Sequence, residues 1–481
     1  MTPAETITPA RRLALSTKLF YGFGSVAFGV KNNGFSYLLL LYYNQVVGLS
    51  PSLVGGAIMI AMAVDAILDP VVGQISDNWR SRWGRRHPFM YAAALPVALS
   101  YLALWNPPHG SPTQLFWYLV VISIIIRSFI TFYEVPSAAL SAELTQDYDE
   151  RTSLQTYRLF FSWIGGLTLY LITFKFLLVP DAHHAVGQTN PVGFARYGLY
   201  AALIMFAAIV ISAVGTHRHI PSFRVAKPRH LGLVGMARDI LGAWSNRSFL
   251  FITLCGLGIS MGMGLAAAMD LYIITFYWEF TSDQLATLVM GVFASPIVAL
   301  AATNAITRRV GKRAAAVMFL VVSVGVATAP MLLRLAGVLP PNHTALLFQI
   351  IFVQSIIFTA FGISGSAVLA SMVADVVEDG ELKTGRRAEG VYFSASSLVA
   401  KAVSGMGIFA ASTILTLVHF PANAKPGHVS PQVIRHFAMV YAPAVIALYG
   451  LGLVFLLGYR ITRSSHQTTL ARLAQAASTA P

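Results

Sequence analysis

Twelve long apolar stretches divide this chain and decide what it can fold into. Each is long enough to cross the hydrocarbon core of a bilayer as a helix, which takes roughly 17–25 residues. The stretches lie at about residues 19–45, 52–77, 88–106, 115–143, 157–180, 196–216, 248–279, 285–307, 314–336, 344–376, 390–418 and 434–459. Hydrophobic residues make up 56% of the 481 residues and charged residues only 11%, whereas soluble proteins carry about 25% charged residues. The sequence therefore predicts an all-α integral membrane protein with twelve transmembrane helices.

The stretches fall into two groups of six. Residues 1–216 form the first group, 217–247 a polar and basic connector, 248–460 the second group and 461–481 a tail. The run RWGRR that follows the second stretch is matched by RVGKR after the eighth. Such a repeat indicates two six-helix halves related by duplication, as in the major-facilitator fold, whose substrate site lies between the halves near the middle of the bilayer.

Basic residues gather on one side of this arrangement. They follow the second, eighth and tenth stretches and also populate the amino terminus, the connector and the tail, whereas the loops after the first and third stretches carry none. Because cytoplasmic loops are rich in Lys and Arg, we expect both termini to be cytoplasmic. No cleavable signal peptide is recognisable, so we expect a multi-pass protein of the plasma membrane, and of the bacterial inner membrane in particular. The net charge of +14 arises at the ends of apolar segments, which does not indicate a nucleic-acid partner.

Two carboxylates interrupt the second apolar stretch. Asp65 and Asp69 are four residues apart and therefore lie on one face of a helix, well inside the bilayer, where a charged side chain is costly and usually functional. Thr131 and Glu134 share a face of the fourth stretch. If the second and fourth helices pack together, these oxygens form a site that suits Na⁺ or a proton as coupling ion. The alternative is that the acids only pair with intramembrane bases and hold the bundle together.

Four basic residues lie within apolar stretches and are candidate partners: Lys31, Arg127, Arg158 and Lys401. Lys401 is some ten residues inside its helix, too deep to reach the interface easily, and it comes from the second half. Arg158 lies near the cytoplasmic end of its helix, so it is either an interfacial anchor or a substrate ligand. Asp270, deep in the seventh stretch, has no role that the sequence assigns.

We expect the charged loops on the cytoplasmic side to have two roles, which are compatible. The basic residues orient the chain, and ion pairs between cytoplasmic loops can close a transporter on its inner side. The residues we assign to this gate are Asp77, Arg80, Arg85, Arg86, Glu143, Arg151, Asp375 and Arg386.

Several runs resemble the glycoside–pentoside–hexuronide:cation symporters of the major facilitator superfamily, a family that includes melibiose permease. They include VDAILDPVVG, ISDNWRSRWGRRHPF, AELTQDYDERTSLQTYR and MVADVVEDGELKTGRR, in the family's order over nearly the whole chain. The resemblance implies that Asp65 and Asp69 bind the coupling cation with help from Thr131, beside Lys401. It also implies a substrate site with the members Lys31, Asn32, Glu134 and Arg158.

Four positions depart from melibiose permease. Asn32 stands where that protein has an aspartate, Glu134 is longer than its aspartate, and the run GISGSA at 362–367 replaces an aromatic residue near the sugar. Leu68 replaces a polar neighbour of Asp69 and slightly favours H⁺ over Na⁺. These changes leave open which sugar is recognised.

The sequence thus predicts a secondary transporter that moves a sugar or glycoside with H⁺ or Na⁺ by alternating access, works as a monomer and needs no cofactor besides the coupling ion. It contains no HExxH, GxSxG or P-loop motif, so we expect no enzyme. One alternative is a carrier of another solute class, such as an exporter or a carrier of uncharged amphiphiles, and Asn32 keeps it open. The other is a membrane sensor that does not transport; the presence of Asp65, Asp69 and Lys401 argues against it.

Overall fold

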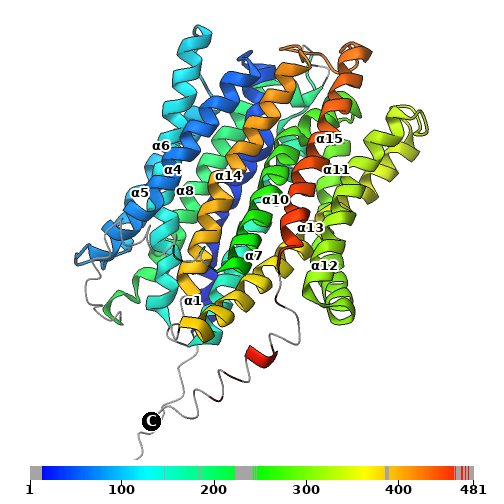
Figure 1. Ribbon diagram of the computed structural model, residues 1–481. Helices are drawn as coiled ribbons and strands as arrows, with labels where there is room; N and C mark the ends of the chain where they lie inside the picture. Colours follow the sequence, from blue (N-terminus) through cyan, green and yellow to red (C-terminus); the bar gives the residue numbers. More distant parts are fainter. Residues whose placement is uncertain are drawn as a thin grey trace, which may run out of the picture.

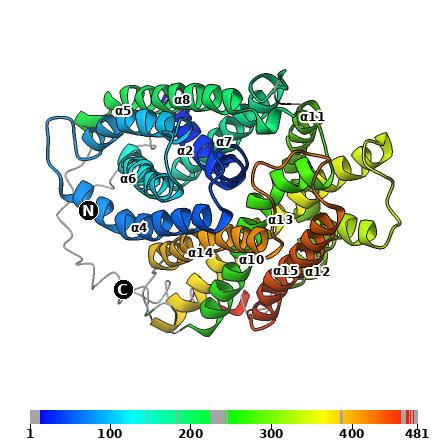
Figure 2. The same ribbon diagram turned by 90° about the horizontal axis from the view of Figure 1, so that it is seen from above.

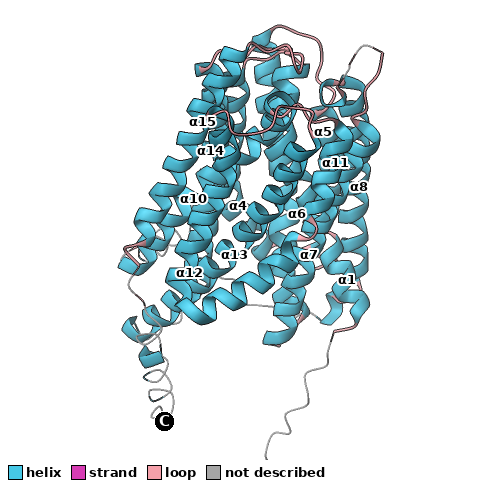
Figure 3. Ribbon diagram, turned by 90° about the vertical axis from the view of Figure 1, so that its right-hand side faces the viewer, coloured by secondary structure: helices cyan, strands magenta, loops and turns pink. Residues whose placement is uncertain are grey.

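The computed structural model describes residues 13–145, 147–182, 184, 186–222, 242, 244, 246–384, 389–459, 461, 467–469, 472 and 475. Within the helices, the side chains of residues 148–149, 383–384, 389–395, 397–402 and 404 are not described. In these ranges the chain forms helices and the loops between them (Figure 3). Nine of the helices there are long and apolar enough to cross a membrane by themselves.

The first half begins with a span that is broken into short pieces. Its elements are α1 (Leu15–Phe23), α2 (Ser25–Asn33), the π-helical turn η1 (Gly34–Leu38), α3 (Leu39–Leu41) and a second π-helical turn, η2 (Tyr42–Val46). Five further spans follow: α4 (Pro51–Asn78), α5 (His87–Leu104), α6 (Pro112–Leu144), α7 (Tyr148–Ile172), which continues through η3 (Thr173–Leu177), and α8 (Pro191–His217). Short 3₁₀ turns, η4 (Gly187–Thr189) and η5 (Ile220–Ser222), flank α8.

The second half contains α10 (Arg247–Tyr272) with its π-helical extension η6 (Ile273–Tyr277), α11 (Ser282–Val292), α12 (Ser295–Leu335), α13 (Ala345–Thr384), α14 (Glu389–Leu417) and α15 (Pro431–Leu456). A kink at Gly311, with φ of 79°, divides the long α12 into two parts, a backbone conformation that glycine adopts without steric cost. Helices α11 and α12 therefore supply two spans. With the broken first span, the described chain contains the predicted twelve, so the expected fold class is confirmed.

Local sequence signals explain where two of the helices begin. Ser111 and Gln114 form a capping box at the start of α6, in which each side chain accepts from the other residue's backbone N–H. The Asp147 side chain accepts from the N–H of Glu150 and caps α7. Helix α7 consequently starts at Tyr148, well before the apolar stretch predicted at 157, because the cap extends the helix beyond its apolar part.

The two halves lie side by side when the molecule is seen along the helices (Figure 2). Within the first half α4 packs against α6, α5 against α8 and α2 against α7, and within the second α12 packs against α13 and α10 against α14 and α15. Across the interface α4 lies against α14, and η1 lies against α10. A Cβ on Gly55 of α4 would lie only 2.0 Å from Ser412 Oγ of α14, so this close crossing depends on a glycine.

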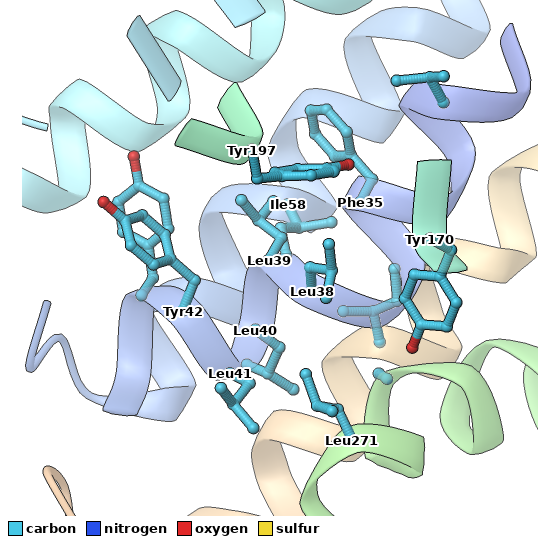
Figure 4. Packing of buried hydrophobic residues seen from close by; sticks show 14 of the residues in the cluster. Phe35, Leu38, Leu39, Leu40, Leu41, Tyr42, Ile58, Tyr170, Tyr197 and Leu271 are labelled. Atoms are coloured by element: carbon cyan, nitrogen blue, oxygen red, sulfur yellow. The ribbon is translucent and has the colours of Figure 1, made fainter. Parts of the chain in front are cut away.

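The first span also passes through the apolar core at this interface. Figure 4 shows Leu38 to Leu41 surrounded by side chains that include Tyr170 of α7, Tyr197 of α8 and Leu271 of α10. Residues from both halves therefore share one buried cluster.

Hydrogen bonds join the halves at one end of the bundle. We call this the loop end. It is opposite the end that carries α1 and the last turn of α15, which lies at the bottom of Figure 1. Tyr272 OH donates to Asn44 Oδ1 at 2.7 Å. Gln45 donates to the carbonyl of Pro421 at 3.0 Å and accepts from the N–H of Ala424 at 2.8 Å.

Two further contacts hold the loop end together. Gln188 donates to the carbonyl of Phe280 at 3.0 Å. Lys175 Nζ of η3 lies 2.7 Å from Asp283 Oδ1 of α11. These hydrogen bonds and the ion pair therefore hold the first and second halves together at the loop end.

Candidate functional site

Helices α4 and α6 bring two carboxylates, a hydroxyl and a guanidinium together. Thr131 Oγ1 lies 3.1 Å from Asp65 Oδ1 and 2.9 Å from Asp69 Oδ1; its single proton can be donated to only one of them at a time. Arg127 Nη2 donates to Asp65 Oδ2 at 2.7 Å. Asp65, Thr131 and Arg127 are buried, and Asp69 is half-buried. We call these four residues the acid cluster.

The helical period explains why the acid cluster forms. Asp65 and Asp69 are four residues apart on α4, and Arg127 and Thr131 are four residues apart on α6, so each pair lies on one face of its helix. Because α4 and α6 pack along each other, the two faces meet. Lys401, the fourth predicted member of the cation site, belongs to α14, which packs against α4, but its side chain lies outside the described part of the structure.

The predicted substrate ligands are distributed over several places. Lys31 is buried, with Nζ 4.6 Å from the centroid of the Phe28 ring. Arg158 Nη1 donates to Tyr21 OH at 3.3 Å. Glu134 is half-buried on α6 and contributes to the electrostatic surroundings of Arg158.

Asn32 differs from these residues because it lines a cavity of about 370 Å³ between the halves. A cavity of this size is within the usual range for small-molecule sites. Its walls come from α2, η1, α7 and η3 of the first half and from α10, η6, α11, α12, α13 and α15 of the second. Lys31, Glu134 and Arg158 are not among the residues described as lining it.

The cavity wall combines aromatic rings with a few polar groups, a composition typical of ligand sites. The aromatic members are Tyr37, Trp163, Tyr170, Phe174, Trp278, Phe358 and Tyr441. The polar members are Asn32, Asn33, Ser162, Asp270, Gln354, Ser355 and Thr359. Most of these were missed by sequence reasoning, since apolar helices give little sign of which face is turned inward. The exceptions are Asn32, which the family resemblance implied as a substrate residue, and Asp270, whose charge within an apolar stretch is a signal in itself.

Four of the predicted gate residues of the first half form ion pairs with one another. Arg86 pairs with Asp77 and also with Glu143, at 3.2 Å from Nε to Oε1. Arg85 Nη2 lies 2.5 Å from the same Glu143 oxygen. These contacts tie the loop after α4 to the end of α6.

The other predicted gate residues lie apart from that group. Arg151 donates to the carbonyl of Thr145, and Arg80 is exposed. In the second half, Asp375 Oδ1 lies 2.6 Å from Lys312 Nζ. Arg386 falls outside the described residues, and pairing of gate residues across the halves stays a prediction.

Comparison with known proteins supports the fold and identifies relatives. Residues 20–463 match the family described as MFS/sugar transport protein. The isoprimeverose transporter of Lactiplantibacillus pentosus is 26% identical, over 93% of this chain and 89% of that protein. The sodium-dependent lysophosphatidylcholine symporter 1 of Gallus gallus is 24% identical, over 82% of this chain and 78% of that protein.

Among solved structures, the crystal structure of the nucleoside transporter NupG has a TM-score of 0.59 and 11% sequence identity, and the match covers 93% of this chain and 99% of that one. At this identity the likeness shows the fold alone. The family match, by contrast, spans nearly the whole chain. The chain therefore belongs to the MFS/sugar transport protein family, the glycoside–pentoside–hexuronide:cation symporters of the major facilitator superfamily, and is a multi-pass membrane transporter rather than an enzyme.

Proposed function

We propose that this protein carries a sugar or glycoside together with H⁺ or Na⁺ across the bacterial inner membrane by alternating access. The observation that carries the proposal is the acid cluster. Carboxylate and hydroxyl oxygens from two helices converge inside a membrane-spanning bundle, where charged groups mark ion pathways and proton relays.

The acid cluster suggests how a cation acts on the protein. A hard cation or a proton that binds Asp65 competes with Arg127, which holds that carboxylate in the present state. Occupation of the cluster therefore changes the contact between α4 and α6. Because α14 of the second half packs along α4, the change reaches the interface between the halves, and Lys401 of α14 is proposed to take part in it.

The cavity supplies the chemistry for a hydroxyl-rich substrate. Sugar hydroxyls both donate and accept hydrogen bonds, and the amides of Asn32, Asn33 and Gln354 do the same. The rings of Tyr37 and Tyr170 lie 5.5 Å apart and give the apolar face of a sugar a surface to pack on. We propose that Lys31, Glu134 and Arg158, which lie off this cavity, contact the substrate in another state of the transport cycle.

The proposed orientation is that the end carrying α1 and the last turn of α15 faces the cytoplasm, and that both termini are cytoplasmic. The loop end, closed by Asn44, Gln45 and Tyr272, then faces outward, so the state described here is closed on the outside. The ion-paired loops around Arg85, Arg86 and Glu143 are proposed to form the inner gate together with Asp375 and Arg386. The protein is proposed to act as a monomer.

A second candidate function is transport of an amphiphile with a polar head. One wall of the cavity is strongly apolar, with Leu285, Leu288 and Val289 of α11 beside Val292 and Met331. A relative similar to this chain over 82% of its length is named for lysophosphatidylcholine. Competition by short-chain alkyl glycosides against simple sugars separates the two candidates, because an apolar wall favours the alkyl chain only if it is part of the site.

The direct test is uptake into proteoliposomes with labelled glycosides, pentosides and hexuronides, first with an imposed Na⁺ gradient and then with an imposed pH gradient. We expect one gradient to drive uphill accumulation of one sugar class. Asp65→Asn and Asp69→Asn are expected to abolish accumulation but to spare exchange down a gradient. The control is Asp181→Asn, which removes a carboxylate from an exposed loop. Uphill uptake that is equal in wild type and both cluster variants would reject the proposed coupling site.

A further inference from the structure

The central cavity has one formally charged residue on its described lining, Asp270 of α10. The side chain is half-buried. Among the described residues, no hydrogen bond or ion pair holds the Asp270 carboxylate. A carboxylate at this depth is costly and marks a functional site by default, so a ligand in the cavity is the natural partner.

The surroundings of Asp270 are those of a site for an uncharged polar molecule. Its carboxylate acts electrostatically on the hydroxyls of Tyr37, Tyr170 and Tyr441, which line the same cavity. Amide groups of Asn32 and Gln354 come from the two halves.

Basic side chains are absent from the described lining. Lys31, although next to Asn32 in sequence, is buried against the Phe28 ring instead. A substrate carboxylate would therefore meet Asp270 without a compensating cation among the described lining residues. Two like charges repel strongly where water is scarce, and this makes the cavity unfavourable for anions.

We propose that Asp270 is a substrate-binding residue that accepts hydrogen bonds from the hydroxyls of an uncharged sugar ring and excludes hexuronates and other anions from the cavity. The inference rests on the proposed sugar transport and narrows its substrate class to neutral glycosides. The two carboxylate oxygens accept several hydrogen bonds at once, and hydrogen bonds to an ionised acceptor are the stronger ones. The carboxylate that Asn32 lacks in the first half is thus supplied from the second half.

Two probes that differ in one group test the proposal: para-nitrophenyl β-glucoside and para-nitrophenyl β-glucuronide. Trp163 and Trp278 line the cavity, so binding to the purified protein is followed by quenching of tryptophan fluorescence. We expect wild type to bind the glucoside about tenfold more tightly than the glucuronide, or more. Asp270→Asn is expected to weaken glucoside binding and to reduce the preference for the glucoside over the glucuronide to below about threefold.

Two further variants keep the test decisive. Asp270→Glu retains the charge and is expected to retain the preference, and Asp181→Asn removes an exposed carboxylate and is expected to match wild type. If Asp270→Asn does not fold, the proposal is judged from the ratio of the affinities for the two probes in wild type and in Asp270→Glu. Equal binding of the two probes by wild type, no binding of either, or an unchanged ratio in Asp270→Asn would overturn the inference.

Uptake of the same probes separates this inference from the proposed function. A binding preference that depends on Asp270 without gradient-driven uptake would reject the transport proposal and leave the site standing. Gradient-driven uptake of both probes at equal rates would reject the role of Asp270 and leave the transport proposal standing.

Discussion

Arg127 and Asp65 form a buried ion pair between α6 and α4, with Nη2 2.7 Å from Oδ2 and less than a tenth of either side chain exposed. Thr131, one turn along α6 from Arg127, reaches both carboxylates of α4. The guanidinium and the hydroxyl therefore hold the acid cluster in one geometry in this state.

Replacement of Arg127 by Gln leaves Asp65 buried without its guanidinium. Removing one partner of a buried ion pair typically costs about 3–5 kcal/mol, so we expect a clearly lower melting temperature in detergent and loss of coupled uptake. The double variant Asp65→Asn/Arg127→Gln should recover part of the thermal stability because neither charge is left alone. Arg196→Gln, at an exposed position of α8, is the control, and equal melting temperatures for the two arginine variants would contradict the prediction.

Replacement of Thr131 by Val removes the hydroxyl but keeps the shape of the side chain. A hydrogen bond to a charged group contributes about 1.5–3 kcal/mol, so the coupling-ion concentration for half-maximal uptake should rise about tenfold or more. The matched control is Ser128→Ala, one residue from Arg127, whose hydroxyl donates only to the carbonyl of Ile124 in its own helix. The same increase in both variants would show that the hydroxyl of Thr131 has no special role.

Replacement of Tyr272 by Phe removes the hydrogen bond to Asn44 that joins the halves at the loop end. A neutral hydrogen bond contributes about 0.5–1.5 kcal/mol, so the population open at this end should rise two- to tenfold, roughly. The measurement is labelling of Ser355→Cys, a cavity position, by an impermeant thiol reagent in a Cys255→Ser background.

The control for this experiment is Tyr118→Phe, because the Tyr118 hydroxyl donates to the Ala103 carbonyl inside the first half. It should leave the labelling rate unchanged. A labelling rate that does not increase in Tyr272→Phe would show that this bond does not keep the loop end closed.

His219 follows α8, and its Nε2 lies 3.0 Å from Thr17 Oγ1 of α1. Burial, and then the positive charge of Arg218, lower the pKa of His219 below its ordinary value of 6.5. The unfolded chain therefore takes up the proton first as the pH falls. The stabilising contact is complete above pH 6.5 and is lost progressively as the pH falls below it toward the lower folded-state pKa.

We expect a small fall in the melting temperature of the purified protein between pH 7.5 and pH 5, beginning near the ordinary pKa of histidine. The fall should be smaller in His219→Asn. His109→Asn, at an exposed position, serves as control. An identical pH profile for wild type and His219→Asn would contradict the assignment.

The sequence predicted the fold class and the approximate position of each span, but not where individual spans are interrupted. The apolar stretches at 285–307 and 314–336 were predicted as two helices, and the non-helical backbone at Gly311 does separate them. The break between α11, which ends at Val292, and α12, which begins at Ser295, was not predicted. The stretch at 19–45 was predicted as one helix and is interrupted by π-helical turns at Gly34–Leu38 and Tyr42–Val46. Hydropathy averages over such local changes in hydrogen bonding and does not detect them.

The acid cluster was also predicted from the sequence only in part. The spacing of four residues predicted that Asp65 and Asp69 share one face of their helix, and Thr131 of the fourth predicted helix does reach both carboxylates. Glu134, which was predicted to share a face with Thr131, has no hydrogen bond to either carboxylate among those described. The sequence offered Lys31, Arg127, Arg158 and Lys401 as partners for the acids. That Asp65 meets Arg127 depends on the distance between α4 and α6, which neighbouring residues do not determine.

The number of spans, the two halves and the chemistry of α4 were determined by the sequence itself, because run length, charge and helical period are properties of neighbouring residues. The cavity was decided only by the tertiary structure. Its walls come from ten elements. The rotation of each is set by close packing, such as that of Gly29 against the Ser162 carbonyl, where a Cβ would lie 1.9 Å away. Asp270 and Asn32 therefore line one cavity for a reason that lies in neither helix alone.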